Sequence, residues 1–272
     1  MNSKIFIIFY IIFSLLFQIS GEDLPFRVGE KFLYKIRWGI MPVGYSSMSI
    51  DGTISCGSQK KCLILKTEAR GNKAIQAVFP VKDKIISYWE PVEKRPYYSE
   101  KDLNEGFYHR HNVVLYDHLK HLASWGEKQF SGNTGKKGEM RKDARWKYKK
   151  GETKNLPSDF QDFLSAIYYT RADKRKGKKG DIFYLTVFDD LKIVKMKMEI
   201  LEVEEIELEV DGLNKKYTAV VSRPYISTSG MFLSKGEVKI WVSNDDKKIP
   251  LKITSKIPYL GHVTVELIST KF

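Results

Sequence analysis

Histidines are the densest group of residues in this sequence that could do chemistry. Four of the five lie between positions 109 and 121, namely His109, His111, His118 and His121. Two imidazoles in an H-x-H pair lie on one face of a strand, and with Asp117 nearby they could bind a metal ion. The stretch lacks a zinc-binding spacing, and basic residues interrupt it. We therefore expect no metal site and interpret these histidines as solvent-facing strand residues.

Two acidic pairs could supply the carboxylates of a glycosidase. They are Asp189–Asp190 and Asp245–Asp246, in the settings VFDDLK and SNDDKK. Both settings read as strand ends or turns, where aspartate commonly bonds to the local backbone. The sequence contains no G-x-S-x-G, H-E-x-x-H, phosphate-loop or dinucleotide-binding motif. We therefore predict a protein with no catalytic residues and no cofactor.

The two cysteines stand close together in SCGSQKKC, between two short runs that read as strands. We expect Cys56 and Cys62 to form a disulfide that staples a β-hairpin, as is usual in an oxidising compartment. A redox-active pair is the alternative. It is the weaker one, because the spacing is not C-x-x-C and no helix start follows.

The first residues indicate export. A basic start, MNSK, precedes the apolar run IFIIFYIIFSLLF, and the small residue Gly21 follows soon after. This is the pattern of a secretory signal peptide, so we predict cleavage after Gly21. A retained membrane anchor would need roughly 20 apolar residues, and no cysteine near the cleavage point could carry a lipid. We expect a signal peptide at 1–21 and a single periplasmic β-rich domain at 22–272.

The net charge indicates which chemical classes of partner the protein can bind. Lys and Arg number 46 against 33 Asp and Glu, which gives a net charge of +13. Such a surface favours phosphate, carboxylate or sulfate groups. Nucleic acid would suit the charge but not an exported protein, so we expect none. Anionic lipid, a lipid-like ligand, an acidic glycan or another envelope protein are the partners that the compartment offers.

Most of the chain alternates apolar and polar residues with a period of two, which is typical of half-buried strands. Eleven runs show this pattern or are rich in strand-forming residues: 31–38, 44–52, 62–70, 77–89, 95–103, 106–117, 192–210, 215–224, 236–243, 248–257 and 262–270. Between Val194 and Val210 the inward parity slips, which indicates a β-bulge. We predict a mainly all-β fold, a curled antiparallel sheet or open β-barrel of about eleven strands.

One stretch breaks the alternation, LPSDFQDFLSAIYYTR at 156–171. Its apolar residues have the spacing of one helical face: Phe160, Phe163, Leu164 and Ile167. Ser158 and Gln161 have the spacing of a capping box at the start of a helix. We therefore expect an amphipathic helix over 158–171 that packs this face on the concave side of the sheet.

Two lysine-rich, glycine-broken stretches bracket this helix, 131–152 and 172–180, and both read as exposed loops. Solvated loop is the plainer interpretation. The alternative is a contact surface for anionic lipid or glycan, because Trp146 and Lys147 stand together in the first stretch.

Five segments carry a family resemblance: GEKFLYKIRWGIMPVGYSSMSI, FPVKDKIISYWEP, LPSDFQDFLSAIYYTR, LTVFDDLKIVKMKMEI and GEVKIWVSNDDKKIPLKI. In this order they resemble segments of bacterial envelope proteins that share domain of unknown function 3108. The most specific is the pattern Q-D-x-L-S-A-x-Y-Y-x-R at 161–171. The resemblance spans most of residues 26–270 and implies an exported, β-rich envelope protein. It implies no reaction.

Two functions remain open. In the first, the helix lines a cavity for a hydrophobic or anionic amphiphilic ligand, with Tyr168, Tyr169 and Arg171 at its rim. In the second, the helix plugs a packed core, and the protein is a structural or assembly factor that acts through protein contacts in the cell envelope. An open or a filled interior beside the helix would separate these functions.

Overall fold

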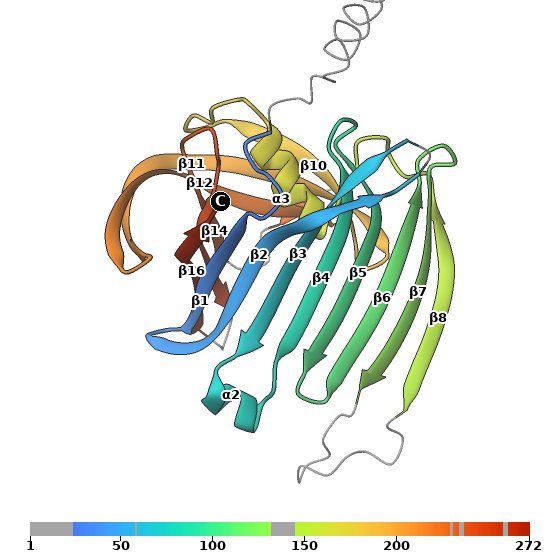
Figure 1. Ribbon diagram of the computed structural model, residues 1–272, viewed down its shortest axis with the longest axis horizontal. Helices are drawn as coiled ribbons and strands as arrows, with labels where there is room; N and C mark the ends of the chain where they lie inside the picture. The colour runs from blue at the N-terminus through green and yellow to red at the C-terminus, as the bar shows by residue number, and fades with distance from the viewer. Residues whose placement is uncertain (1–23, 58, 132–144, 229–230, 234–236, 258–260) are drawn as a thin grey trace, which may run out of the picture.

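The computed structural model describes residues 24–57, 59–131, 145–228, 231–233, 237–257 and 261–272 (Figure 1). Within these ranges sixteen strands form one sheet, accompanied by two helices. The signal peptide predicted for residues 1–21 lies outside the described residues. No helix in the ranges above is long and apolar enough to cross a membrane.

The strands are numbered in chain order. The first eight are β1 (Lys31–Trp38), β2 (Met41–Ser55), β3 (Lys61–Gly71), β4 (Lys82–Glu90), β5 (Arg95–Glu105), β6 (Tyr108–Asp117), β7 (Leu122–Ser131) and β8 (Trp146–Lys154). The others are β9 (Gln161–Asp162), β10 (Ile182–Asp189), β11 (Lys192–Val210), β12 (Leu213–Thr228), β13 (Met231–Leu233), β14 (Glu237–Ser243), β15 (Pro250–Ile257) and β16 (Gly261–Lys271).

Neighbours in the sheet run β8-β7-β6-β5-β4-β3-β2-β1-β16-β15-β14-β12-β11-β10-β9, and β13 pairs with β12. The strands nearest the two ends of the chain, β1 and β16, therefore pair with each other inside the sheet. Of the pairings described, that of β9 with β10 is parallel and the others are antiparallel. The predicted curled antiparallel sheet is confirmed.

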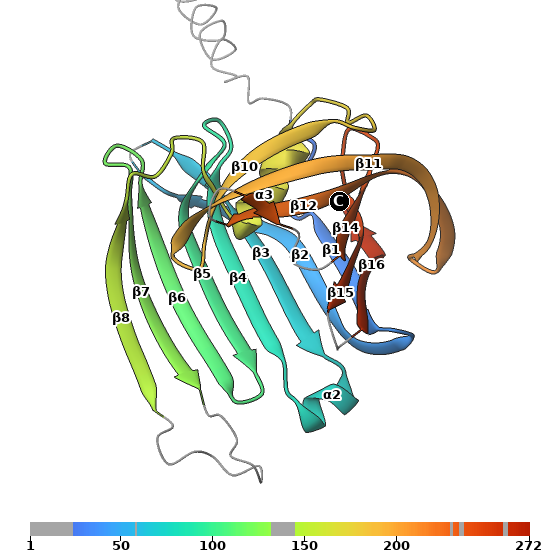
Figure 2. The ribbon, with the colours of Figure 1, turned by 180° about the vertical axis from the view of Figure 1, so that it is seen from behind.

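The sheet curls so that its β10 end returns over its first half (Figures 1 and 2). A register shift between Ile200 and Glu202 of β11 marks one β-bulge, inside the stretch where the inward parity slips in the sequence. Further shifts interrupt the ladders of β1, β2, β4 and β14. Bulges increase the local twist and bend of a strand, so they account for part of the curl.

The expected number of strands, about eleven, was too low. The sequence pattern missed β7, β8, β9, β10 and β13. The strand β8 begins in the stretch 131–152 that we expected to be a loop, of which 132–144 lie outside the described residues. Its lysines weaken any alternation of apolar and polar residues, but its backbone continues the ladder of β7 from Phe130–Trp146 to Leu122–Lys154.

The helix α2 (Lys73–Val78) was also missed: its first four residues lie between the predicted strands 62–70 and 77–89, and its last two were assigned to the second of them. Asn72 caps it by accepting a hydrogen bond from the backbone N–H of Ile75. None of its residues is buried. It therefore forms a short exposed connection between β3 and β4.

The helix α3 (Phe163–Ala172) begins later than the predicted residue 158. Ser158 does not cap it. The Asp162 carboxylate accepts from the backbone N–H groups of Leu164 and Ser165, and the Ser165 hydroxyl accepts from the N–H of Asp162. These bonds form a capping box, and Gln161 with Asp162 belongs to β9. The helix lies inside the curl, against β3, β4, β5 and β10 (Figure 1).

Two apolar clusters fill the interior. The larger one packs α3 against the first strands and the returning half of the sheet, with Phe32, Leu65, Trp89, Leu164 and Tyr168 buried near its centre. The second cluster contains Tyr116, Phe160 and Phe188 and lies where β6 meets β10. Helix α3 therefore lies at the centre of a packed core.

Candidate functional site

The helix residues proposed to bind a ligand lie mostly in the core. Leu164 and Tyr168 are fully buried in the larger cluster, and Ile167 is half-buried beside it. Phe160 precedes the helix and packs its ring against Tyr116 and His118, with centroid distances of 5.0 and 5.4 Å.

Two of the proposed ligand-binding residues are only partly buried. Tyr169 is half-buried. Phe163 was expected on the buried face, but 47% of it is exposed. The late start of the helix explains this difference, because α3 packs through Leu164, Ser165, Ala166, Tyr168, Arg171 and Ala172 instead.

The space beside α3 is almost closed. A cavity of about 10 Å³ lies between β5, β6, β10 and the start of the helix, bounded in part by Lys101, Tyr116 and Asp162. That volume holds at most about one water molecule. This recess is therefore too small for a ligand, and the apolar cluster around Leu164 and Tyr168 packs the helix into the curl.

Arg171 was expected at the rim of a cavity, but it lies in the core with 1% of its side chain exposed. Its guanidinium donates two hydrogen bonds to the carboxylate of Glu30, at 2.5 and 2.9 Å, and its Nε donates to the carbonyl of Lys247 at 3.1 Å. The rings of Phe26, Phe32 and Tyr168 surround it within 5.3 Å of Cζ. Paired in this way, Arg171 fastens α3 to the residue before β1 and to the β14–β15 connection, and it is not available to a ligand.

Asp162 is the second charged group that α3 buries. Besides capping the helix, it accepts a hydrogen bond of 2.5 Å from the hydroxyl of Ser87. Burial raises the pKa of the Asp162 carboxyl to about 6, although the three hydrogen bonds oppose the shift. A raised carboxyl pKa can signal a catalytic acid. Asp162 faces no space that would admit a substrate, so we assign it a structural role.

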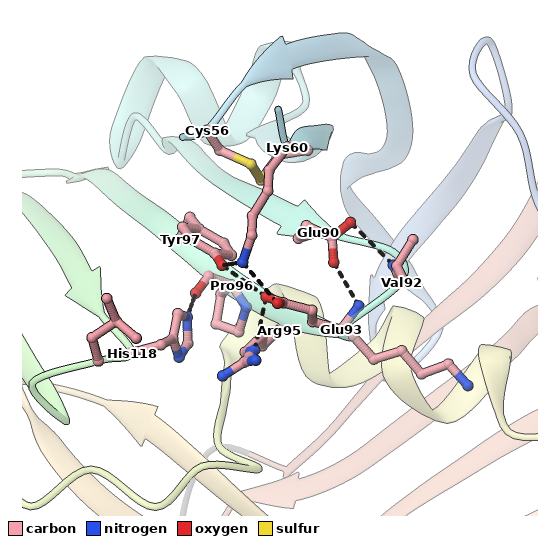
Figure 3. A network of polar contacts seen from close by, with 12 residues as sticks. Cys56, Lys60, Glu90, Val92, Glu93, Arg95, Pro96, Tyr97 and His118 are labelled. Atoms are coloured by element: carbon pink, nitrogen blue, oxygen red, sulfur yellow. Dashed lines mark hydrogen bonds and ion pairs between the residues drawn. A yellow bond between two sulfur atoms is a disulfide. The ribbon is translucent and has the colours of Figure 1, made fainter. Parts of the chain in front are cut away.

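The disulfide of Cys56 and Cys62 is present, as predicted, and joins the ends of the β2–β3 hairpin. Within the loop it closes, Lys60 reaches the β4–β5 connection (Figure 3). Its Nζ atom lies 2.7 Å from both Glu93 Oε1 and the hydroxyl of Tyr97. Hydrogen bonds to Lys60 and Tyr97 lower the pKa of Glu93 to about 2, against a smaller opposing effect of burial.

The contacts of Lys60 were not visible in the sequence, because the partners lie more than 30 positions apart. Beside them, the ring of Tyr97 packs on His118, and His118 contacts the carbonyl of Pro96 (Figure 3). The network ties two neighbouring hairpins together and presents no open nucleophile or metal site.

The four clustered histidines have separate partners. His109 contacts Asn104, His111 contacts Glu100, and His121 contacts the carbonyl of Leu156. Desolvation by burial lowers the pKa of His118. Among the described residues, no group of three His, Cys, Asp or Glu side chains is placed to hold a metal ion.

The acidic pairs differ in what they do. Asp245 bonds to the backbone N–H groups of Lys247 and Lys248, which is the local turn role expected for it. Asp189 and Asp190 instead reach across the curl to Lys101 and Arg110. Their ion pairs join β10 to β5 and β6, so these carboxylates help to close the fold.

The remaining predicted site residues, Trp146 and Lys147, begin β8. Residues 145–150 are all exposed, and β8 pairs only with β7 among the described strands. Lys128 of β7 places its Nζ atom 4.3 Å from the ring centroid of Trp146 and 5.8 Å from that of Tyr148. We call Lys128 together with Trp146–Lys150 the β8 surface.

The β8 surface combines cations with aromatic rings. Along Trp146–Lys150 three lysines and two aromatic residues stand without an acidic residue, and 69% of Tyr148 is exposed. Because the side chains of a strand alternate, Lys147 and Lys149 lie on one face, while Trp146, Tyr148 and Lys150 lie on the other. Such a surface can hold an anion beside an apolar group.

Comparison with known proteins adds a family and a fold. A family model described as "Protein of unknown function (DUF3108)" matches residues 33–268. No curated protein matches the chain. The chain is similar to a β-barrel-like protein of domain of unknown function DUF1849 from Brucella abortus, with 10% identity and a TM-score of 0.51 over 90% of this chain and 98% of that chain. At this identity the likeness concerns the fold.

A second solved structure is a protein with a YmcC-like fold from Bacteroides fragilis NCTC 9343. It has 6% identity and a TM-score of 0.35, over 92% of this chain and 98% of that chain. At this TM-score it adds nothing to the argument.

Proposed function

The chain belongs to the DUF3108 family of proteins of unknown function, and from this premise we propose that it is an exported, non-catalytic envelope protein that binds an anionic amphiphile on its surface. The observation that carries the proposal is the β8 surface. Lys128 and Lys150, on the face that carries the exposed rings of Trp146 and Tyr148, would hold a phosphate or carboxylate head group, and the rings would contact an apolar chain.

The filled interior determines where the ligand would bind. Since the cavity beside α3 measures about 10 Å³, it cannot take an acyl chain. We therefore place the ligand outside the curl, and the helix residues from Phe160 to Arg171 take no part in binding it.

An exported location is part of the proposal. It rests on the signal-peptide pattern at 1–21, and the disulfide of Cys56 and Cys62 supports it, because such bonds persist in oxidising compartments. In the periplasm, anionic lipids and acidic glycans are available to a basic protein.

To test this proposal, dihexanoylphosphatidylglycerol is titrated, below its critical micelle concentration, into the protein that lacks residues 1–21. Calorimetry and tryptophan fluorescence measure the binding. We expect binding that weakens with added salt, because exposed charges are screened within about 10 Å at 0.1 M ionic strength. Dihexanoylphosphatidylcholine, which carries no net charge, should bind much more weakly.

Charge reversal locates the site. The double variant Lys128→Glu, Lys150→Glu should lose at least about tenfold in affinity, since each basic residue near an anionic group contributes about 1 kcal/mol. The double variant Lys147→Glu, Lys149→Glu, on the other face of β8, should lose less. The control reverses Lys174, Lys176 and Lys179, three exposed lysines of the loop after α3. Absence of binding at low salt, or equal binding of both lipids, would contradict the proposal.

A structural or assembly factor is the second candidate, and the packed core favours it. The filled curl gives a rigid body whose surface, and not its interior, would contact another envelope protein. If the lipid titration fails, cross-linking in the intact envelope would test this candidate by the recovery of one defined protein partner.

A further inference from the structure

Three connections meet at one end of the sheet. They are the β1–β2 turn, α2 with Phe79 after it, and the β5–β6 turn (Figures 1 and 2). The side-chain Nδ2 of Asn72 donates to the carbonyl of Pro42 at 2.5 Å, which ties α2 to the start of β2. The backbone N–H of Gly106 donates to the carbonyl of Pro80 at 2.8 Å, which ties the β5–β6 turn to the segment after α2.

These connections carry large apolar side chains that the fold does not bury. They are Trp38, Ile40, Met41, Val78, Phe79 and Phe107. Ile40 is 94% exposed and Val78 is 86% exposed. The β1–β2 turn needs a residue such as Gly39, whose φ is +57°, but its geometry does not require Ile40 or Met41. Six apolar side chains on three adjoining connections exceed the scattered exposure that is normal for a surface.

A basic hollow lies beside the same connections. Its volume is about 380 Å³, and Arg70, Gly71, Lys73, Gln76 and Lys82 line it. Gln76 is fixed by a hydrogen bond of 2.6 Å to the carbonyl of Val81. The lining contains three cations and no carboxylate, and none of the three cations forms an ion pair with another described residue. The hollow is therefore suited to an anionic head group.

We propose that this end of the sheet is a docking surface for an anionic lipid bilayer. Ile40, Met41, Val78 and their neighbours enter the interface between head groups and acyl chains, while Arg70, Lys73 and Lys82 bind lipid phosphates. Peripheral proteins bind anionic bilayers through this combination of exposed apolar side chains and cations. The proposal rests on the proposed function for its ligand class, but it assigns a separate site and a bilayer as the source of the ligand.

The β8 surface lies at the same end of the sheet. The β5–β6 turn leads into Tyr108, which pairs with Ser131, and the preceding residue of β7, Phe130, pairs with Trp146 at the start of β8. A bilayer at the three connections would therefore supply single amphiphiles to the β8 surface close by.

Vesicle flotation tests the docking surface. The chain without residues 1–21 is mixed with vesicles of phosphatidylcholine alone or of phosphatidylcholine with phosphatidylglycerol, at low and high salt. We expect flotation with the anionic vesicles at low salt. The double variant Ile40→Ser, Val78→Ser should bind these vesicles on the order of tenfold more weakly, because it removes apolar insertion without changing charge.

Matched controls separate docking from general effects. Leu119→Ser alters a 96% exposed leucine in the β6–β7 turn, at the opposite end of the strands, and should float like the wild type. Arg70→Glu with Lys82→Glu should abolish the preference for anionic vesicles, whereas Lys174→Glu with Lys176→Glu should not. Circular dichroism and the thermal midpoint check that each variant is folded.

The results distinguish the two proposals. If the wild type binds short-chain phosphatidylglycerol but does not float with anionic vesicles, the docking surface is wrong and the proposed function stands. The docking surface is also wrong, and the proposed function is unaffected, if the variant Ile40→Ser, Val78→Ser floats to the same extent as the wild type. If neither short-chain lipid nor vesicles bind, both proposals are overturned.

Discussion

Three ionisable side chains, Glu30, Asp162 and Arg171, are buried at the centre of this fold, which is unusual for a packed interior. Glu30 and Arg171 form a bidentate pair with 1% of each side chain exposed, and Asp162 is almost fully buried beside Ser87. Burying a charge is costly unless it is paired and hydrogen-bonded. The Arg171–Glu30 pair meets that condition. Asp162, which has hydrogen bonds but no ion pair of its own, meets it only in part.

The state of Asp162 makes stability depend on pH. Burial raises its pKa to about 6 in the folded protein, against about 3.9 in an unfolded chain. Between these values the folded state binds more protons at Asp162, so the contribution of this carboxyl to stability is fully present below about pH 4 and is lost as the pH rises through 6. The shift of about two units corresponds to about 3 kcal/mol.

We predict that Asp162→Asn removes this part of the pH dependence, because asparagine can still cap the helix but does not titrate. Denaturant titrations of the variant and the wild type between pH 4 and 7.5 would measure the difference. Asp159→Asn, which alters an exposed carboxyl just before β9, is the control. If the unfolding free energy of Asp162→Asn depends on pH in the same way as that of the wild type, the pKa of the Asp162 carboxyl is the same in the folded and the unfolded protein.

At the scale of elements, α3 shows how a small shift in a helix start changes its buried face. The apolar spacing of Phe160, Phe163, Leu164 and Ile167 suggested one face, but Gln161 and Asp162 pair with β10 instead of joining the helix. Phe160 is then buried in the strand connection and Phe163 faces out. The predicted capping box of Ser158 and Gln161 was wrong, because Asp162 and Ser165 form the capping box instead.

We predict that Leu164→Ala costs about 2–5 kcal/mol of unfolding free energy, because Leu164 is fully buried. Phe163→Ala should cost about 1 kcal/mol or less, since 47% of Phe163 is exposed and its ring faces the Nζ atom of Lys101, 5.5 Å from the ring centroid. Ser158→Ala should cost nothing measurable. Chemical denaturation of the three variants decides among these values. A large loss for Phe163→Ala would return Phe163 to the buried face.

The elements that could be predicted from the sequence are those in which buried positions hold apolar side chains and exposed positions hold polar ones. The long strands of the first half alternate clearly, and the bulge in β11 appeared as a slip of parity. The strand β8 could not be predicted in this way, because its backbone pairs with β7 while its side chains face water. Lysines on such an edge also oppose pairing with another sheet. The contacts of Arg171 with Glu30, 141 positions apart, left no signal in a single sequence.

At the scale of the whole molecule, the curl is closed by contacts between β10 and the strands β5, β6 and β8. Ion pairs join Lys101 to Asp189 and Arg110 to Asp190, and the Thr153 hydroxyl donates to the carbonyl of Leu191 at 3.3 Å. Beneath them lies the apolar cluster around Phe188. This closure, together with the packed apolar clusters, supports the proposal that a ligand binds on the outer surface.

The apolar cluster should hold the curl more strongly than the ion pairs do. Phe188 is 3% exposed, and replacing a buried phenylalanine by alanine costs about 3–5 kcal/mol. The side chain of Asp190 is 54% exposed, and an exposed ion pair contributes at most about 1 kcal/mol. We therefore expect Phe188→Ala, but not Asp190→Asn, to loosen the β10 end of the sheet.

Hydrogen exchange of the folded protein would measure this loosening. In Phe188→Ala the amides of Ile182–Asp189 should exchange much faster than in the wild type, because their local opening becomes less costly. The amides of β1 and β16, which pair inside the sheet, serve as the internal reference and should change less. If Asp190→Asn accelerates exchange in β10 as much as Phe188→Ala does, the ion pairs hold the closure. In that case added salt, which screens ion pairs, should also accelerate exchange in β10.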